Sequence, residues 1–374
     1  MLSFRTTGYN GYGVQYSPFF DSKLAVATAA NYGLVGNGRL YILNIEPNGS
    51  ITSPISWETQ DGLFDLSWSE VHENQVATAS GDGLVKLFDF TVGQFPVMNW
   101  KEHLREVFSV NWNLVEKDKF VTASWDGLIK VWTPSRNTSL MTLQPQIDSI
   151  TKTVQINQPP MSHQANHQNP GSTANCVYNA QFSPHSPSTI LSCNGSSHVS
   201  VWDIRSPDML QLDFIAHGGL EALTCDWNKY KPTVIASGGT DKSIRIWDLR
   251  MIDRPNAFGA PSPAYHTRGP SPMNELLGHE FAVRKVQWSP HDAQELMSTS
   301  YDMTSRIWRD SSNERARFLN GARGVLQMGG GCRGVFRTHK EFVIGCDYSL
   351  WGEPGWVTTT GWDEMVYVWD AKRV

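Results

Sequence analysis

The stretch His103–Trp132, HLREVFSVNWNLVEKDKFVTASWDGLIKVW, decides the fold of this chain. Three short segments in it, VFSVNW, KFVTAS and LIKVW, alternate apolar and polar residues and are rich in β-branched and aromatic side chains. A period of two predicts strands rather than helices, and Asp126-Gly127 between the last two segments predicts a tight hairpin turn. Because such a unit cannot bury both of its faces alone, it needs neighbouring units of the same kind.

The same unit recurs along the chain, marked by an aromatic or apolar residue six positions after the turn residue. These marks are Leu43, Phe88, Trp132, Trp202, Trp247, Trp308 and Trp369. Several of them are about 45 residues apart, a period typical of propeller blades with four strands each. In this pattern the chain resembles the WD-repeat family over nearly its whole length. We therefore expect an all-β, seven-bladed WD-repeat β-propeller that spans residues 1–374 as a single domain.

The resemblance also implies a buried hydrogen-bonded chain of His, Ser or Thr, Asp and Trp within a blade. Four repeats carry all four residue types: His103, Thr122, Asp126 and Trp132; His217, Ser237, Asp241 and Trp247; His279, Ser298, Asp302 and Trp308; and His339, Thr359, Asp363 and Trp369. Buried polar groups must be paired, so a complete chain stiffens its blade. Asn37, Thr59, Thr173 and Ser196 replace the expected Asp or His in the first, second and fourth repeats, which should be less rigid.

The ends of the chain predict how the ring closes. The last unit ends with its third strand, MVYVWDA, so the N-terminal residues 2–8 (LSFRTTG) should supply the missing outer strand. Longer spacings between repeats predict insertions near 145–172, 251–273 and 310–336, each expected as a surface loop. The first insertion is rich in Gln, Asn and Pro.

Composition excludes several classes of function. A net charge of −5 argues against a nucleic-acid surface, and the five scattered cysteines are expected to be reduced thiols of an intracellular protein. No apolar run predicts a membrane span or a signal peptide. His163 and His167, in a Pro-flanked loop, are not expected to bind a metal. No phosphate loop, catalytic elbow or zinc helix is present in the sequence, so we expect no cofactor and no enzyme.

The surface of the ring is the remaining candidate for a functional site. The WD-repeat resemblance assigns the rim of the upper central opening to three positions in each blade. Aromatic residues at these positions are Tyr12, Phe64, Phe108, Trp125, Tyr178, Tyr301 and Trp362, and acidic residues at or near them are Asp61, Asp65, Glu106 and Glu221. Arg284 and Phe342 also fall on rim positions but are not among the predicted site residues. Exposed aromatic clusters with carboxylates suit a short basic amphipathic peptide; packing between blades is the alternative for each aromatic.

A closer resemblance is carried by longer segments. GYGVQYSPFFDSKLAVATAANYGLVGNGRLYIL near the start, TQDGLFDLSW (59–68), KEHLREVFSVNWN (101–113), SWDGLIKVW (124–132) and VRKVQWSPH (283–291) are similar to the WD-repeat peroxins, the receptors for the type 2 peroxisomal targeting signal. The resemblance implies an import receptor that shuttles between the cytoplasm and the peroxisome. Its expected partners are cargo proteins with an N-terminal type 2 signal, a co-receptor peroxin and docking peroxins.

In that family the signal begins with a basic and an aliphatic residue and ends with His or Gln and an aliphatic residue, so on a helix these groups share one face. We therefore expect Asp61, Asp65, Glu106 and Glu221 to hold its basic end, and the seven rim aromatics to line an apolar groove. The competing class is a general WD-repeat scaffold, such as a substrate-adaptor subunit of a ubiquitin ligase or of a chromatin complex.

Overall fold

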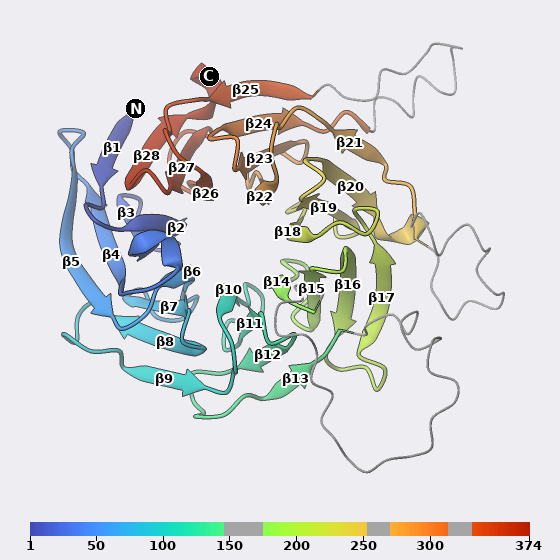
Figure 1. Cartoon of the computed structure of the whole chain (residues 1–374), viewed down its shortest axis with the longest axis horizontal. Helices are drawn as coiled ribbons and strands as arrows, with labels where there is room; N and C mark the ends of the chain where they lie inside the picture. The colour runs from blue at the N-terminus through green and yellow to red at the C-terminus, as the bar shows by residue number, and fades with distance from the viewer. Residues whose placement is uncertain (146–174, 253–269, 313–330) are drawn as a thin grey trace.

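The computed structural model describes residues 1–145, 175–252, 270–312 and 331–374. Seven four-stranded antiparallel sheets stand around a central axis as the blades of a propeller (Figure 1). This confirms the all-β, seven-bladed architecture. Each sheet is built from the short alternating segments seen in the sequence, and the innermost strand of every blade faces the central channel.

The blades follow one another in chain order, and within each blade the strands run from the inner to the outer edge. Blade 1 contains β2 (Asn10–Tyr16), β3 (Lys23–Ala29), β4 (Gly38–Ile45) and β5 (Ile51–Thr59); blade 2 contains β6 (Leu63–Trp68), β7 (Gln75–Ser80), β8 (Leu84–Asp89) and β9 (Met98–Lys101). Blade 3 contains β10 (Val107–Trp112), β11 (Phe120–Ser124), β12 (Ile129–Trp132) and β13 (Met141–Leu143); blade 4 contains β14 (Val177–Phe182), β15 (Thr189–Asn194), β16 (His198–Asp203) and β17 (Leu210–Ile215).

The second half of the ring repeats this order. Blade 5 contains β18 (Ala222–Trp227), β19 (Val234–Gly239), β20 (Ile244–Asp248) and β21 (Asn274–Leu276); blade 6 contains β22 (Val283–Trp288), β23 (Glu295–Ser300), β24 (Ser305–Arg309) and β25 (Cys332–Phe336). Blade 7 contains β26 (Val343–Tyr348), β27 (Trp356–Gly361), β28 (Met365–Asp370) and, from the other end of the chain, β1 (Leu2–Arg5).

The ring closes as the sequence predicts. β1 pairs antiparallel with β28, with Leu2 opposite Val368 and Arg5 opposite Met365, so both ends of the chain share blade 7 (Figure 1). Blades 7 and 1 also approach closely at the channel: a Cβ on Gly345 would come within 2.7 Å of the Tyr12 carbonyl oxygen. A side chain at position 345 would therefore push the closing blades apart.

All four predicted polar chains form inside their blades. In blade 3, His103 Nδ1 lies 2.9 Å from Asp126 Oδ2, its Nε2 lies 2.8 Å from Thr122 Oγ1, and the Trp132 indole N–H donates to the same oxygen. Blades 5, 6 and 7 repeat these contacts. In blade 4 the last link of the chain is present, since the Trp202 indole N–H donates to Ser192 Oγ.

A second polar ring joins neighbouring blades at the channel wall. The next-to-last residue of each inner strand contacts the following blade, and these residues are Gln15, Ser67, Asn111, Gln181, Asp226, Gln287 and Asp347. Asp347, for example, accepts the backbone N–H of Tyr16 at 2.7 Å and so links blade 7 to blade 1. Apolar clusters pack behind this ring between adjacent blades. The inner strands are therefore held in a fixed circle.

One part of the insertion prediction is wrong. The end of the range 310–336 is a strand, since β25 pairs with β24 and completes blade 6. Gly334 and Phe336, two residues apart, are buried, which continues the period-two pattern of the other strands. The rest of this range up to residue 330, most of 251–273, and nearly all of 145–172, which includes His163 and His167, lie outside the described residues.

Candidate functional site at the upper face of the ring

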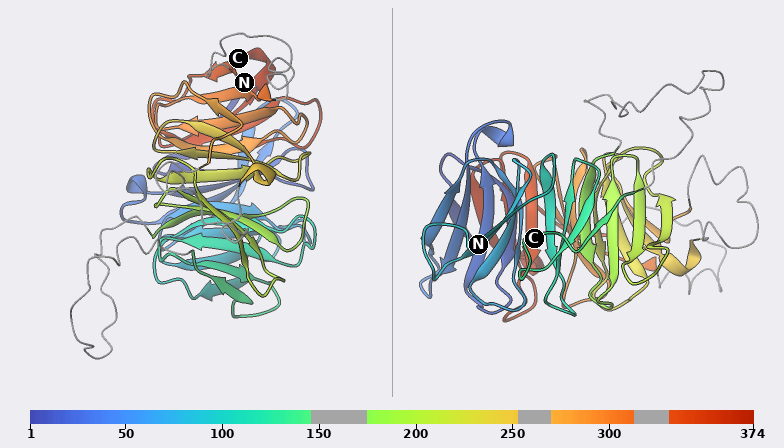
Figure 2. Two further views of the ribbon diagram at one scale, coloured as in Figure 1. Left: turned by 90° about the vertical axis from the view of Figure 1, so that its right-hand side faces the viewer. Right: turned by 90° about the horizontal axis from the view of Figure 1, so that it is seen from below.

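We call the end of the ring at which the inner strands begin the upper face. Its blade 1 loop contains the short helix η1 (Asn31–Gly33), seen as a blue coil above the ring in the right-hand view of Figure 2. The turn aspartates of the blades lie at the same end because each follows the second strand, which runs antiparallel to the first. The predicted rim residues belong to this face.

The predicted aromatic residues form one continuous belt around the opening. Neighbouring ring centroids are 4.6–6.2 Å apart, within the range of favourable aromatic pairs. The belt runs from blade 6 through blades 7, 1, 2 and 3 to blade 4 in the order Tyr301, Phe342, Trp362, Tyr12, Phe64, Phe108, Trp125, Tyr178. Phe342 was not among the predicted site residues, yet it links Tyr301 to Trp362.

Exposure of these aromatics differs from the prediction. Tyr12, Phe64 and Tyr178 are 7%, 6% and 7% exposed, so the expectation that they present their rings to solvent is wrong. They are buried because the neighbouring belt residues cover their faces, which is the packing alternative noted above. Phe108, Trp125, Tyr301 and Trp362 are partly exposed. The accessible part of the belt therefore consists of these four residues resting on a buried aromatic floor.

Three of the four predicted acids lie at the upper ends of blades 2, 3 and 5, beside the belt. Asp61 accepts the N–H of Gly62 at 2.7 Å; burial and the neighbouring carboxylates of Asp82 and Glu106 raise its pKa. Glu221 accepts a hydrogen bond from the Tyr178 hydroxyl at 3.0 Å. Within the described ranges, Glu106 forms one ion pair, with Arg105 at 3.5 Å, and both side chains are partly exposed. Asp61, Glu106 and Glu221, which we call the acid arc, thus create a negative field along one side of the belt.

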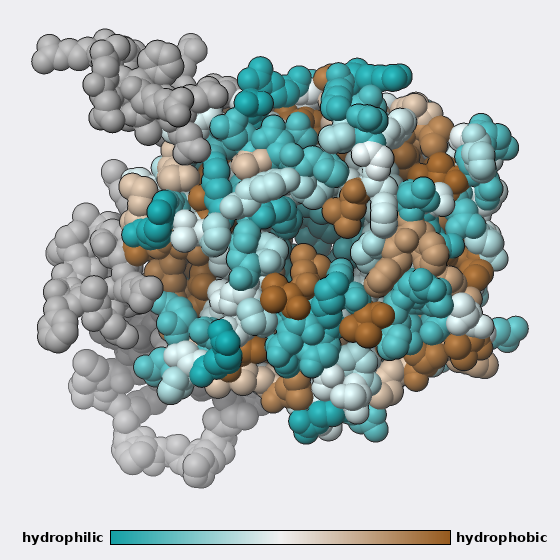
Figure 3. Space-filling view, turned by 180° about the vertical axis from the view of Figure 1, so that it is seen from behind, coloured by the Kyte–Doolittle hydropathy of each residue, from teal (hydrophilic) through white to brown (hydrophobic). Residues whose placement is uncertain are grey.

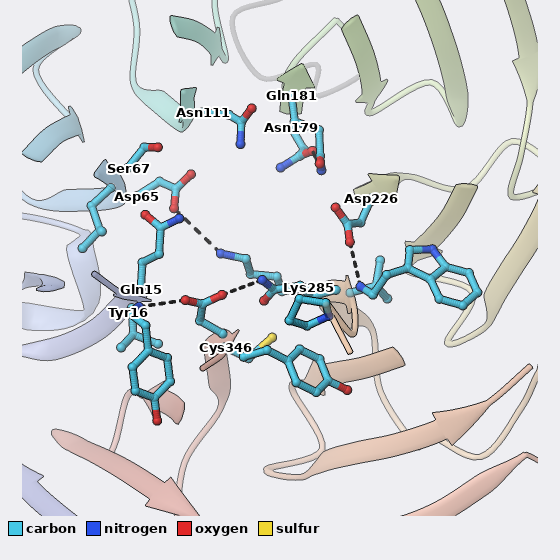
Figure 4. Close-up of a pocket in the computed structure, with 18 of the residues that line it drawn as sticks. Gln15, Tyr16, Asp65, Ser67, Asn111, Asn179, Gln181, Asp226, Lys285 and Cys346 are labelled. Atoms are coloured by element: carbon cyan, nitrogen blue, oxygen red, sulfur yellow. Dashed lines mark hydrogen bonds and ion pairs between the residues drawn. The ribbon is translucent and has the colours of Figure 1, made fainter. Parts of the chain in front are cut away.

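Asp65 does not belong to this arc, and its predicted place at the rim is wrong. Its carboxylate lies inside the channel, where Oδ2 accepts the Val110 N–H at 3.0 Å and Oδ1 lies 3.9 Å from Nζ of Lys285 (Figure 4). Lys285 reaches this carboxylate across the channel from blade 6. The pair lines a cavity of about 190 Å³ in the channel. Asp65 therefore links blade 2 to blade 3 and lies opposite a partly accessible ammonium in the channel.

A Lys285→Met variant should lose about 1–2 kcal/mol of stability near pH 8 and less near pH 5. Burial raises the pKa of Asp65, and the Lys285 ammonium opposes that rise. Removal of the ammonium in the variant therefore raises the pKa of Asp65 further. Near pH 5 the folded variant then binds a proton that the unfolded chain does not bind. Because this protonation stabilises the folded state, the loss of stability is smaller at the lower pH. Urea unfolding across this pH range would measure the difference; an equal loss at both pH values would contradict the ion pair.

Two features of the upper face were not included in the predicted site. The guanidinium of Arg284, from blade 6, lies 5.2 Å from the ring centroid of Phe108 in blade 3, so a cation covers part of the opening. Exposed apolar side chains also surround the belt: Tyr32, Leu34 and Val35 in the η1 loop, Leu104, Leu220 and Phe281. Leu104 is 88% exposed. Leu104, Leu220 and Phe281 could have been found from the sequence. Each is an apolar residue one to three positions after a blade histidine, in a turn that is otherwise polar.

This arrangement suits a surface that binds a peptide. Partly exposed aromatic and aliphatic side chains can cover the apolar face of a helix, while the acid arc can pair with basic side chains at one end of it.

The described residues contain no cluster of three or more His, Cys, Asp or Glu side chains placed to hold a metal ion. Within the same described ranges, no helix is long and apolar enough to cross a membrane. All five cysteines are free thiols.

The ring of seven blades and the repeated His–Asp and Trp–Ser/Thr contacts define the class: this is a WD-repeat β-propeller. A family model described as WD domain, G-beta repeat, matches residues 94–133, 210–248 and 270–309.

Relatives that match over the whole chain give the particular family. The chain is 52% identical to the peroxisomal targeting signal 2 receptor of Komagataella phaffii, with 100% of both chains covered. It is 50% identical to the receptor of the same name from Saccharomyces cerevisiae, covering 99% of this chain and 100% of the relative. Identity to the Mus musculus receptor is 32%, over 98% and 95%. The chain therefore belongs to the peroxisomal targeting signal 2 receptor family, which supports a role in peroxisomal import.

Proposed function

We propose that this protein binds the N-terminal type 2 targeting signal of peroxisomal matrix proteins on its upper face. The observation that carries the proposal is the acid arc beside the partly exposed belt residues, in a chain whose relatives are named as receptors for this signal. The signal helix lies with its apolar face on Phe108, Trp125, Tyr301 and Trp362. Its basic end faces Asp61, Glu106 and Glu221, because these carboxylates attract basic side chains.

We also propose the remaining steps of the import cycle that the resemblance to this family implies. A co-receptor peroxin joins the receptor and its cargo, docking peroxins receive the complex, and the receptor shuttles between the cytoplasm and the peroxisome. The exposed apolar residues Leu34, Val35 and Leu104 extend the upper face beyond the length of one short helix. They are suitable contacts for the co-receptor. Full-length identity to receptors favours this account over a general WD-repeat scaffold.

Binding of a fluorescent type 2 signal peptide to the purified protein, with and without a co-receptor peroxin, tests the proposal. We expect saturable binding that is lost when the first basic residue of the peptide is replaced by Glu. No binding by the folded protein under either condition would instead favour the general scaffold. Equal binding of both peptides would remove the acid arc from the site.

The affinity for the signal should fall on mild acidification. Burial and the Asp82 and Glu106 carboxylates raise the pKa of Asp61, so this acid loses its charge at a higher pH than an ordinary aspartate does. A neutral Asp61 attracts the basic end less. Titrations at decreasing pH should use the form of the signal that carries Gln in place of His, so that only receptor groups titrate. An Asp61→Asn variant should show a weaker pH dependence.

A further inference from the structure

A second pocket lies on the opposite, lower face, where blades 7 and 1 meet. It has a volume of about 260 Å³, and its walls are formed by Leu2, Ile45, Trp351, Trp356 and Val368. Trp351 and Trp356 are 37% and 36% exposed, unlike the fully buried tryptophans of the blade cores. Figure 3 looks onto this face, on which apolar groups are scattered among hydrophilic ones around the hollowed centre. We name this site the seam pocket.

The seam pocket is lined in part by the buried side chain of Tyr16. Tyr16 is 3% exposed, and among the described residues its hydroxyl makes no hydrogen bond. Its backbone N–H is bound to Asp347 at the channel, whereas its ring points away from the channel (Figure 4). The hydroxyl oxygen itself is closed off from solvent, so Tyr16 contributes to the wall of the pocket rather than to ligand pairing.

The charge of the seam pocket is one-sided. Its lining includes the carboxylate of Asp21 and no basic residue. Asp21 is exposed and makes no ion pair within the described ranges. Glu353, in the neighbouring loop of blade 7, is also exposed and without an ion pair among the described residues. The faces of tryptophan rings attract cations, so the tryptophan walls and the two carboxylates both favour a positively charged ligand.

The walls are held in place before any ligand arrives. The Trp351 indole N–H donates to the Ser17 carbonyl oxygen at 2.9 Å, which joins the blade 7 loop to the blade 1 loop. His291 and Tyr230 make the matching contacts between earlier blades, to Ser349 O and Pro290 O. Trp351 therefore has a fixed orientation, and a ligand need not order it on binding.

The volume of the seam pocket suits one long side chain, because cofactor and drug-sized ligands need about 300–1,000 Å³. Arginine fits the walls and the polar groups together. Its aliphatic stem can lie along the apolar walls, its flat guanidinium can stack on an indole ring, and its several N–H donors can pair with the Asp21 carboxylate. Lysine has a smaller, more strongly hydrated head and fewer donors.

We propose that the seam pocket binds an arginine side chain from an extended segment of a partner protein that docks on the lower face. The inference does not depend on the proposed signal binding, because Asp21, Tyr16 and Trp351 lie at the opposite end of the ring from the acid arc. Both partners can therefore occupy the receptor at once.

The test is an NMR titration of the full chain with labelled tryptophan indoles. The probe is N-acetylarginine methylamide, and the comparators are the lysine analogue and the neutral isostere N-acetylcitrulline methylamide. A Trp351→Phe spectrum and a Trp356→Phe spectrum identify the two wall signals. We expect both signals to shift saturably with the arginine probe, less with the lysine analogue and not with the citrulline analogue.

Substitutions make the outcome decisive. Asp21→Asn should weaken binding of the arginine probe at least about fivefold, since it removes the charge but keeps the shape. Glu73→Gln, at an exposed acid in the matching loop of blade 2, is the control and should bind as the wild type does. Signal-peptide binding should be unchanged in both variants. An equal shift by citrulline, no shift of either indole, or wild-type affinity in Asp21→Asn would each overturn the proposal.

Discussion

A Glu106→Lys variant should bind a type 2 signal peptide at least about tenfold more weakly than the wild-type protein, a loss of about 1.4 kcal/mol or more. Glu106 lies in the acid arc, and Arg105 is its sole ion-pair partner among the described residues, at 3.5 Å and with both side chains well exposed. An exposed pair of this kind contributes little, so Glu106 remains available to a ligand. Lysine at this position would add a second cation near Arg105 and repel the basic end of the signal.

The matched control for this prediction is Asp118→Lys. Asp118 is an exposed acid of the same blade, in the loop between β10 and β11 on the lower face, and among the described residues its carboxylate forms an ion pair with Lys119 alone. The substitution changes the net charge equally but far from the acid arc, so affinity should change less than about twofold at physiological salt. Fluorescence anisotropy of the labelled peptide measures both variants. Equal losses would mean that overall charge, rather than Glu106, controls binding.

The largest effect on stability is expected for Asp302→Ala, about 3 kcal/mol or more. Asp302 Oδ2 lies 2.8 Å from His279 Nδ1 and also accepts the Glu280 N–H, while Oδ1 accepts from Thr304. Burial alone raises the pKa of Asp302, but these bonds outweigh burial and the pKa is lowered. The carboxylate thus stabilises the folded state at neutral pH, and this contribution is lost as the pH falls below the ordinary range of aspartate.

Asp82→Ala is the control for this prediction. Asp82 occupies the same turn position in blade 2, but no histidine contacts it within the described residues; it accepts the Leu84 N–H and lies 3.5 Å from the Lys86 ammonium. Loss of these contacts should lower the free energy of unfolding by only about 1 kcal/mol. Urea unfolding gives both values. Comparable losses in the two variants would show that the turn itself, rather than the histidine chain, stabilises a blade.

The fold could be predicted from the sequence because its determinants are local and repeated. Period-two segments, the Asp-Gly turn after Trp125 and the spacing from His103 to Trp132 define one blade, and each further copy supports the same interpretation. Closure by residues 2–8 followed from counting strands in the last unit, and pairing of β1 with β28 confirms it. The strand at Cys332–Phe336 was missed because it is short and follows a long segment without a repeat signal.

The surface could be predicted only in part, because burial depends on neighbours from distant blades. Position within a strand correctly assigns Tyr12 and Phe64 to the opening, but only the folded ring shows that adjacent rings cover them. Asp65 is next to an upper-face position, yet its side chain turns into the channel, where Lys285 from blade 6 meets it. The unpaired hydroxyl of Tyr16 likewise depends on packing that no sequence pattern encodes.

The most direct test of the central claim is a charge-swap cycle between Glu106 and the first basic residue of the signal. Affinities are measured for wild-type and Glu106→Lys receptors, each with the natural peptide and with a peptide that carries Glu at that position. If the two charges meet, each single reversal lowers the affinity about tenfold and the double reversal recovers much of the loss. Additive losses in the double reversal would contradict the placement of the basic end at the acid arc.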